Sequence, residues 1–522
     1  MRINLIYNRT NDNVIGINNE LVFHIKEDMD YFKEITTGHI VVMGYNTWKS
    51  LKKPLKDRYN VVISKNHYDE ILGNDLESEM EQEDLVKPDK VFQSYEEMID
   101  YFFTTRHYGS ETFKEEVTMC GDHNYLVESP DIFIIGGSRL YEEAFSNGVN
   151  SIYETRCMED VLDPIDNLYK YTDKGDGTDI AKCEIDVRDN DKYLLTYCKQ
   201  SNGEGKLYRK VRLSDGNIFT ERMKMNIRYG FLIYRSKSEV NMEELSYLRL
   251  LNKVYGNGGK RKSRNSEVLS LFGEKMKFDL RKGFPLLTSK KVGWKTILRE
   301  LIWFLNGSTN NKLLQEKNVH IWDGNSSKEY MESRGLDYEE GELGPIYGFQ
   351  WRNFGGEYGV KGGKEGVDQV KYMIDLINND PTSRRILLSA WNPPDLDKMA
   401  LPPCHIMFQI YVDGDFIDGQ MYQRSGDMFL GVPFNIASYS FLLHIIGKIT
   451  KKTPRYFHHI LGDCHIYSNH YEAIEKQLKN NTYPFPTIEI SDELNNIDTI
   501  DESYINIKNY RSNSSIKAEM IA

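Results

Sequence analysis

Cysteine is scarce in this sequence, with six residues among 522. The six form no C-x-x-C pair, so neither a disulfide framework nor a structural zinc site is predicted. Basic residues are also outnumbered, because 66 Lys and Arg accompany 78 Asp and Glu and leave a formal charge of -12. Non-specific binding to nucleic acid or to an anionic membrane requires the opposite excess. We therefore expect neither partner, and an anionic small substrate must be held by a few placed arginines.

Long apolar runs are missing too. The N-terminal stretch MRINLIYNRTNDNVIG has no signal-peptide hydrophobic core. No apolar run in the sequence approaches the ~20 residues that a membrane-spanning helix requires. Together with the scarce cysteines, this favours a cytoplasmic protein in a reducing compartment, with no targeting segment.

A chain of 522 residues is too long for one compact core and predicts two domains, or three. Residues 1–234 alternate short apolar runs, such as HIVVMG and DIFIIGG, with helix-like segments. This alternation is typical of an α/β sheet with crossover helices. Two polar segments, 66–90 and 104–130, interrupt it and are expected to be surface insertions. Residues 235–244 form a polar junction, and a second domain is predicted over 245–522.

The second domain places a cysteine beside a histidine in LPPCHIMFQIYV. A free cysteine is more often a small buried hydrophobe than a nucleophile, so Cys404 alone indicates no chemistry. Adjacent residues of a strand point to opposite faces, which weighs against His405 as a base for the thiol. Glu300 lies at the margin of the apolar face of a helix predicted after FPLLTSKK, with Ser289 as a candidate cap. A carboxylate there is costly unless it is paired or used.

A metal site is an alternative for the stretch HHILGDCHIYSNH, which contains four histidines and a cysteine. Their spacing matches no standard ligand pattern, and we expect no metal. The residues concerned are His458, His459, Cys464, His465 and His470.

Several stretches of the second domain occur in the order found in thymidylate synthase. They include GFPLLTSKKVGWKTILRELIWFLNGSTN, NVHIWDGNSS, DPTSRRILLSAWNP, QMYQRSGDMFLGVPFNIASYSFLLH and GDCHIYSNH. The resemblance runs from Leu245 to Ala522 and implies an α+β domain with a sheet-mediated homodimer. It implies methylation of dUMP to dTMP with 5,10-methylenetetrahydrofolate as co-substrate.

The resemblance makes Cys404 the nucleophile that adds to carbon 6 of the pyrimidine, since thiolate is the most nucleophilic side chain near neutral pH. Arg424 is the positive charge expected to lower the pKa of this thiol. Arg384 and Arg385 offer planar forks for the phosphate and, in the family, reach into the partner's site. The amide of Asn435 can both donate and accept, which distinguishes uracil from cytosine.

The other implied roles complete the expected synthase site. Its dUMP contacts are Arg264, Arg384, Arg385, His405, Gln423, Arg424, Ser425, Asp427, Asn435, His465 and Tyr467, its further catalytic residues are Glu300 and Tyr347, and its folate contacts are Trp322 and Asp427. The segment KSRNSEVLSLFG that supplies Arg264 is one residue shorter than the common family pattern. The terminal SSIKAEMIA resembles the family's mobile tail, which closes over the ligands.

The first domain contains VIGINNELVFHIKEDMDYFKEIT, VVMGYNTWKSL, PLKDRYNVVIS and IFIIGGSRLYEEAF. Their order resembles dihydrofolate reductase from about Arg2 to Tyr234, which implies a mixed sheet with flanking helices and NADPH-dependent reduction of dihydrofolate. Asp28 takes the position of the family's active-site carboxylate, which anchors the pterin and promotes protonation of nitrogen 5. The implied folate contacts are Phe32, Arg58 and Thr155, and the implied NADPH contacts are Ile15, Gly16, Gly44, Thr47, Gly136, Gly137, Ser138, Arg139, Leu140 and Tyr141.

This domain departs from the family at several positions. Val22-Phe23 replaces the usual Pro-Trp, Tyr7-Asn8 replaces Ala-Ala, and Tyr45 stands where an arginine often meets the NADPH phosphate; Lys26 and Lys49 are candidates for that charge. The two domains in one chain resemble bifunctional dihydrofolate reductase-thymidylate synthase. A synthase whose reductase-like domain binds folate without catalysis stays open as an alternative. An RNA-regulating protein is disfavoured, because the chain is acidic and lacks interleaved aromatic and basic residues.

Overall fold

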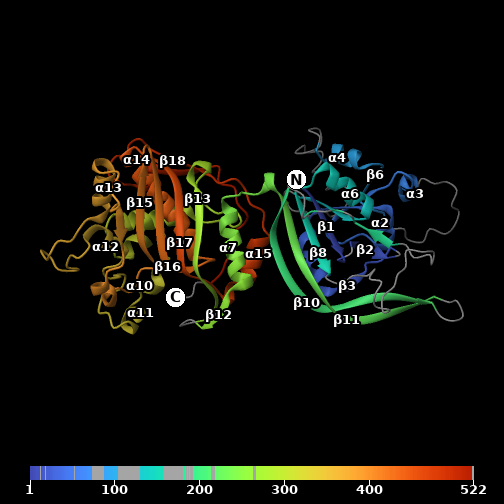
Figure 1. The fold of residues 1–522 in the computed structure, drawn as a ribbon, viewed down its shortest axis with the longest axis horizontal. Coiled ribbons are helices and arrows are strands. Elements are labelled where there is room, and N and C mark those ends of the chain that lie inside the picture. The colour runs from blue at the N-terminus through green and yellow to red at the C-terminus, as the bar shows by residue number, and fades with distance from the viewer. Residues whose placement is uncertain are drawn as a thin grey trace. The chain divides into compact units, whose positions relative to one another are not determined.

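The computed structural model divides the chain into two compact units, Met1–Ser238 and Glu239–Ala522 (Figure 1). It describes residues 1–11, 13–17, 19–51, 53–72, 87–103, 130–157, 180–183, 185, 187, 192–212, 218–262 and 266–519.

The first unit is built on a mixed sheet with the strand order β3-β10-β11-β8-β1-β7-β4-β5-β6. The strands are β1 (Ile3–Arg9), β3 (Phe23–Ile25), β4 (Ile40–Gly44), β5 (Tyr59–Ile63), β6 (Lys90–Phe92), β7 (Ile132–Gly136), β8 (Ser151–Cys157), β10 (Tyr193–Arg212) and β11 (Ile218–Ser236). From β8 to β6 the neighbouring strands run parallel, whereas β11, β10 and β3 add antiparallel pairs. The mixed sheet predicted for this part of the chain is confirmed.

Helices flank this sheet, and a small second sheet pairs β2 (Val14–Ile17) with β9 (Ile180–Lys182). The helices are α1 (Lys26–Thr36), α2 (Tyr45–Leu51), α3 (Tyr68–Leu72), α4 (Tyr95–Phe103) and α6 (Ser138–Asn147). The prediction of an insertion over 66–90 was too wide. Helix α3 lies inside it with Ile71 only 5% exposed, and β6 begins at Lys90 and pairs with β5. The rest of that segment, 73–86, and 104–129 of the other predicted insertion lie outside the described residues.

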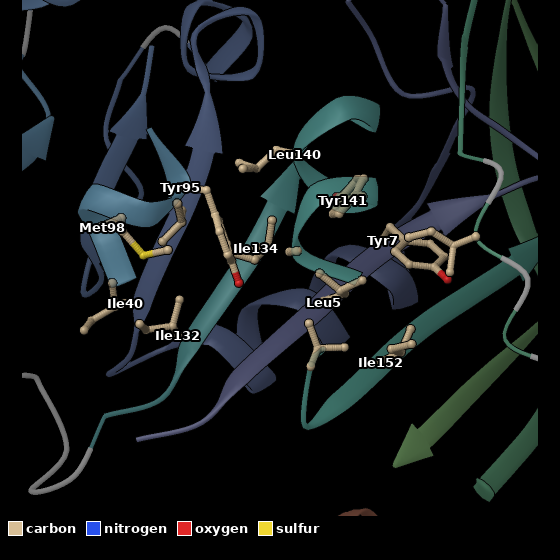
Figure 2. Close-up of a cluster of buried hydrophobic side chains, with 14 of the residues drawn as sticks. Leu5, Tyr7, Ile40, Tyr95, Met98, Ile132, Ile134, Leu140, Tyr141 and Ile152 are labelled. Carbon is tan, nitrogen blue, oxygen red and sulfur yellow. The ribbon is translucent and has the colours of Figure 1, made fainter. Parts of the chain in front are cut away.

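The parallel strands β4, β5 and β7 are apolar almost throughout because both of their faces are covered, as in other parallel sheets. Figure 2 shows the resulting core, in which Ile40 and Ile132 lie near Met98, and Leu5 lies near Ile152. Tyr141 of α6 packs edge-on against Tyr7 of β1, with ring centroids 5.3 Å apart.

The second unit contains a sheet of six strands in the order β12-β13-β17-β16-β15-β14. These strands are β12 (Gly259–Lys262), β13 (Glu267–Asp279), β14 (Leu387–Ser389), β15 (His405–Asp413), β16 (Phe416–Asp427) and β17 (Thr453–Tyr467), and a separate hairpin joins β18 (Thr487–Ile490) to β19 (Ile505–Lys508). The helices are α7 (Glu244–Asn257), α8 (Trp294–Leu305), α9 (Lys312–Gln315), α10 (Asp323–Ser326), α11 (Lys328–Ser333), α12 (Tyr347–Asn353), α13 (Gln369–Asn379), α14 (Gly431–Thr450) and α15 (Tyr471–Lys479). Short 3₁₀ turns are η1 (Lys237–Glu239), η2 (Leu280–Lys282), η3 (Pro393–Lys398), η4 (Ser468–His470), η5 (Ile497–Thr499) and η6 (Glu502–Tyr504).

Helix α14 is the central helix of this unit and contacts β16, β17 and α8. By length and mean hydropathy alone it could cross a membrane, contrary to the expectation that no segment would. The structure buries 72% of that apolar window inside the unit, as for a core helix of a soluble protein.

Helix α8 buries the face that its sequence predicts, with Ile297, Leu301 and Leu305 each 0% exposed. Its cap was predicted wrongly, since the helix begins after Gly293 without a side-chain cap. Ser289 is instead buried, and its backbone N–H donates to the Glu244 carboxylate at 2.8 Å.

We expect Ile134→Ala to lower the free energy of unfolding of the first unit by about 2 to 5 kcal/mol, because it leaves a cavity in a close-packed core. Ile134 is 0% exposed on the central strand β7. Phe103→Ala is the control, since that side chain is 43% exposed on α4. Urea denaturation monitored by circular dichroism measures both, and equal losses would contradict the placement of this core.

Candidate active sites

The first unit contains a cavity of about 460 Å³ at the ends of β1 and β7 that face α1 and α2. Many residues predicted to hold folate or NADPH meet there, although they come from distant parts of the chain. Those that line the cavity are Ile15, Gly16, Asp28, Phe32, Thr47, Gly136, Gly137, Ser138 and Tyr141.

Asp28 is the buried acid of this cavity, and its side chain projects from the first turn of α1. Its Oδ1 accepts a hydrogen bond from the Thr155 hydroxyl at 2.5 Å, and its Oδ2 accepts one from the Asn8 amide at 2.9 Å. Burial raises the pKa of this carboxyl, while the two hydrogen bonds oppose that rise. A carboxyl of this kind can bind the N–H groups of a heterocycle.

The Gly136-Gly137 turn brings the start of α6 to the cavity wall. A Cβ atom on Gly136 would lie 2.6 Å from Thr47 Oγ1, so glycine is required for β7 and α2 to approach this closely. Helix α6 begins at Ser138, and its N-terminal N–H groups and dipole suit an anion such as a pyrophosphate. The glycine pair and the helix N-terminus therefore fit the NADPH that the sequence implies.

Other predicted residues of this site do not line the cavity. Arg58 is 6% exposed and donates to Thr36 Oγ1 and to the carbonyl oxygens of Lys33 and Lys56. Gly44 lies beside the backbone of the glycine pair, Arg139 is exposed, and the Leu140 side chain belongs to the hydrophobic core.

Tyr45, at the position of the missing arginine, is part of a small polar cluster. Its ring stacks on His67 with centroids 3.8 Å apart, and its hydroxyl donates to Glu70 Oε1 at 2.5 Å. Lys49 Nζ lies 5.6 Å from the centroid of the same ring, whereas Lys26 is exposed at the start of α1. Lys49 is therefore the better placed of the two candidate cations.

In the second unit, Cys404 precedes β15 and lies beside Arg424 of β16, whose Nη2 is 4.0 Å from the Cys404 Sγ. The guanidinium is held by the carbonyl oxygens of Pro402 and Pro403, at 3.0 and 2.8 Å. The Arg424 charge lowers the pKa of this thiol, as expected, but the net shift is upward. Burial raises the pKa of Cys404, and the Arg424 charge offsets only part of that rise.

Tyr347 and His405 pack behind the thiol. The Cys404 backbone N–H donates to the Tyr347 hydroxyl oxygen at 2.7 Å, and the His405 ring stacks on the Tyr347 ring with centroids 4.1 Å apart. His405 Nδ1 lies 2.8 Å from the Tyr439 hydroxyl, and burial lowers the pKa of this imidazole to about 3. His405 is therefore a neutral imidazole, and its side chain contributes to the packing of an aromatic cluster.

Glu300 and Trp322 form a second pair in this unit. Trp322 Nε1 donates to Glu300 Oε1 at 2.8 Å. Burial raises the pKa of the Glu300 carboxyl to about 7, although the indole hydrogen bond opposes the rise. A group with this pKa can both give and accept a proton near neutral pH.

Asp427 lies at the end of β16, next to the start of α14, where Asn435 is half-buried. The Asp427 Oδ1 accepts a hydrogen bond from the Phe429 N–H at 2.9 Å and lies 3.8 Å from His470 Nδ1. His470 Nε2 is 2.8 Å from the carbonyl oxygen of Glu519, so the C-terminal tail reaches this site.

The remaining predicted dUMP contacts are more dispersed. Gln423 donates to the Ser425 carbonyl oxygen at 2.9 Å, and His465 packs edge-on against Tyr467 with ring centroids 5.1 Å apart. Arg384 and Arg385 are exposed at the edge of the sheet before β14, and Arg264 lies outside the described residues. The described histidines of HHILGDCHIYSNH do not converge, and no group of three or more potential metal ligands is found in the part of the chain that is described.

Sequence reasoning missed Lys290, which is buried close to Asp427. Its Nζ donates to the Phe429 carbonyl oxygen and lies 3.5 Å from the centroid of the Phe429 ring. Burial lowers the pKa of this amine to about 7, against the attraction of Asp427. The only signal in the sequence was its place in FPLLTSKK, directly before a strongly apolar helix.

Comparison with known proteins agrees with this arrangement. A thymidylate synthase family model matches residues 245–522, and a dihydrofolate reductase family model matches residues 2–99. The fold and its two sites therefore define an enzyme with two catalytic units, both of which act in folate metabolism.

Similar proteins combine both units over nearly the whole chain. The bifunctional dihydrofolate reductase-thymidylate synthase of Paramecium tetraurelia is 36% identical, with 97% of this chain and 96% of that protein covered. Those of Zea mays and Plasmodium berghei are 34% and 36% identical, covering 98% and 93% of this chain and 95% and 83% of the relatives. This chain belongs to the bifunctional dihydrofolate reductase-thymidylate synthase family. Nothing in these matches favours the alternative of an impaired reductase.

The Glu300 carboxyl predicts a pH-dependent stability. Between its ordinary pKa of 4.5 and its folded pKa of about 7, the folded chain holds one more proton than the unfolded chain. The free energy of unfolding must therefore fall as pH rises through this window, by about 3 kcal/mol. Glu300→Gln, which does not titrate, is expected to remove that slope. Urea titrations at pH 5 and pH 8 measure it, with the exposed Glu316→Gln as control; an unchanged slope in Glu300→Gln would exclude this carboxyl as its source.

Proposed function

We propose that the second unit methylates dUMP with 5,10-methylenetetrahydrofolate through Cys404, and that the first unit reduces dihydrofolate with NADPH through Asp28. The observation that supports this most is the pair of separate sites: a thiol 4.0 Å from an arginine, and a buried carboxyl in a cavity of about 460 Å³. The first reaction releases dihydrofolate, and the second consumes it. We also propose a cytoplasmic location.

In the synthase reaction, the sulfur of Cys404 forms a bond to carbon 6 of dUMP, which makes carbon 5 nucleophilic toward the methylene carbon. The thiol must first lose its proton, and Arg424 is the cation beside it that stabilises the thiolate. Glu300 has the pKa required to exchange protons with the pyrimidine through water. Carbon 5 would then bond to the methylene carbon. It would lose its proton, with Tyr347 assisting, as the bond between the methylene carbon and the folate nitrogen breaks. A hydride from the tetrahydrofolate would reduce the methylene to a methyl group as the sulfur leaves, which yields dTMP and dihydrofolate.

In the reductase reaction, Gly136, Gly137, Ser138 and Thr47 would hold NADPH, which would supply the hydride when bound. Asp28 accepts hydrogen bonds from the N–H edge of the pterin while Thr155 fixes one of its oxygens. The negative charge of Asp28 favours protonation of nitrogen 5, which must precede hydride transfer. Phe32 lines the same cavity and would pack on the pterin ring.

A homodimer through the sheet of the second unit is part of this proposal. One side-chain row of the sheet is buried, as for Phe408 and Ile410, at 0% and 2% exposure. Tyr411 of the other row is 64% exposed and lines a groove with Arg384, Gln420 and His458. A second copy on this face would cover the groove and allow Arg384 and Arg385 to reach the phosphate in the partner's site.

Reciprocal substitutions should separate the two activities. We expect Cys404→Ser to abolish dUMP-dependent formation of dihydrofolate and the covalent nucleotide adduct seen by mass spectrometry, while NADPH oxidation with dihydrofolate persists. Asp28→Asn should do the reverse, because it removes the acid of the other site. Cys464→Ser and Asp30→Asn are the controls, since Cys464 is a buried cysteine of β17 and Asp30 is exposed on α1. An adduct that survives Cys404→Ser would exclude this cysteine as the nucleophile.

Shared sites in a homodimer predict complementation. Cys404→Ser and Arg385→Ala chains, each inactive as a synthase alone, are refolded together. A random mixture contains mixed dimers with one intact site, so about a quarter of wild-type synthase activity should return. Mixing Cys404→Ser with Arg424→Ala is the control, because Arg424 lies beside Cys404 of its own chain. Each site of such a mixed dimer lacks either the cysteine or the arginine, so no activity should return. If the Arg385→Ala mixture stays as inactive as the control, Arg385 does not cross the interface.

A further inference from the structure

Asn8 lies on β1, in a position where the family usually has alanine. Parallel pairing of β1 with β8 places Asn8 directly beside Thr155. Both side chains donate to the same carboxylate, Thr155 to Asp28 Oδ1 at 2.5 Å and Asn8 to Asp28 Oδ2 at 2.9 Å. Each oxygen of Asp28 therefore has its own donor, and Asn8 also lines the cavity.

A third residue fixes which end of the Asn8 amide faces the acid. The Cys157 thiol, which is 0% exposed, lies 3.4 Å from Asn8 Oδ1 and donates to it. Since a thiol is a better donor than acceptor, it favours the orientation in which the oxygen faces Cys157 and the NH₂ group faces Asp28. The chain Cys157, Asn8, Asp28 thus gives the amide a donor role.

Of the other ionisable groups in this region, Tyr141 and Glu154 are engaged elsewhere, the buried Tyr7 hydroxyl has no hydrogen-bond partner among the described residues, and Glu20 and Lys182 line the same cavity. Tyr141 on α6 donates to the Ile6 carbonyl oxygen at 2.9 Å. Glu154 on β8 is paired with Arg9 and Arg156, on β1 and β8. Tyr7 on β1 is buried, with a pKa raised mainly by burial. The described groups that bond directly to the Asp28 carboxylate are the Asn8 amide and the Thr155 hydroxyl.

We propose that Asn8 is a positioning residue of the reductase reaction, which holds the Asp28 carboxylate toward the cavity and favours its ionised form. This inference rests on the proposed role of Asp28. Burial raises the pKa of Asp28, and the Asn8 hydrogen bond is one of the two contacts that limit the rise. An alanine in this position could not make that contact.

The test is the pH dependence of hydride transfer, measured in single turnovers of NADPH and dihydrofolate on the full chain. Asn8→Ala should move the titration of the reaction upward by about one pH unit, because one hydrogen bond to the ionised acid is lost. Asn8→Asp has nearly the same shape but puts a second carboxylate beside Asp28, so it should move the titration further upward. Asn8→Gln, which keeps the donor, should restore part of the wild-type profile.

A purely structural role of Asn8 would lower the melting temperature without moving the pH profile, and that result would overturn the proposal. If Asn8→Ala does not fold, Asn8→Asp decides, because it preserves the volume: an unshifted profile contradicts the proposal and a raised one supports it. Asp28→Asn is measured in parallel. If that variant still reduces dihydrofolate with the wild-type profile, the proposed function of Asp28 fails, and the inference about Asn8 fails with it for that separate reason. Methyl transfer by the second unit should stay unchanged in every Asn8 variant and serves as an internal standard.

Discussion

Removal of water from ionisable side chains is the constraint on which both sites depend. A buried carboxyl or thiol resists ionisation, and a buried amine resists protonation, unless a neighbour compensates. In this chain burial raises the pKa of Asp28, Glu300 and Cys404 and lowers that of Lys290. Each neighbour is specific to its site: two neutral donors for Asp28, an indole N–H for Glu300 and a guanidinium for Cys404. The reactivity of the enzyme is therefore set by a small number of polar contacts made in dry surroundings.

Much of the fold followed from the sequence because the signals were local. Apolar runs separated by helical segments predicted the mixed sheet, and the spacing in α8 predicted its buried face. The predictions were wrong where contacts between distant parts of the chain determine the local structure. Ser289 looks like a helix cap, but Thr288 and Ser289 donate instead to the buried carboxylate of Glu244, a residue more than 40 positions earlier. The polar segment 66–90 looked like an insertion, although both of its described ends belong to elements of the unit.

Cys404 became a candidate through the family motifs around it, because a lone cysteine indicates no chemistry. Properties that depend on the three-dimensional surroundings of a residue were harder to predict. The sign of the Cys404 pKa shift depends on the balance between burial and the Arg424 charge, and sequence gives no measure of either. Lys290 and His470 reach Asp427 from a loop and from a 3₁₀ turn, and no periodicity marks them. Asn8 was visible only as a departure from the family, and its partner Asp28 became apparent once β1 and α1 were placed in space.

The C-terminal segment is joined to the loop that carries Lys290. Tyr510 donates to the Leu287 carbonyl oxygen and accepts from the Val292 N–H, while Asn513 binds both the Thr288 and the Asn481 carbonyl oxygens. These side chains satisfy backbone groups on either side of the lysine. Removal of the chain from Tyr510 onward would remove these hydrogen-bond partners from the loop. Digestion by a carboxypeptidase should therefore impair methyl transfer to the pyrimidine first, while the nicotinamide-dependent reaction of the other unit continues.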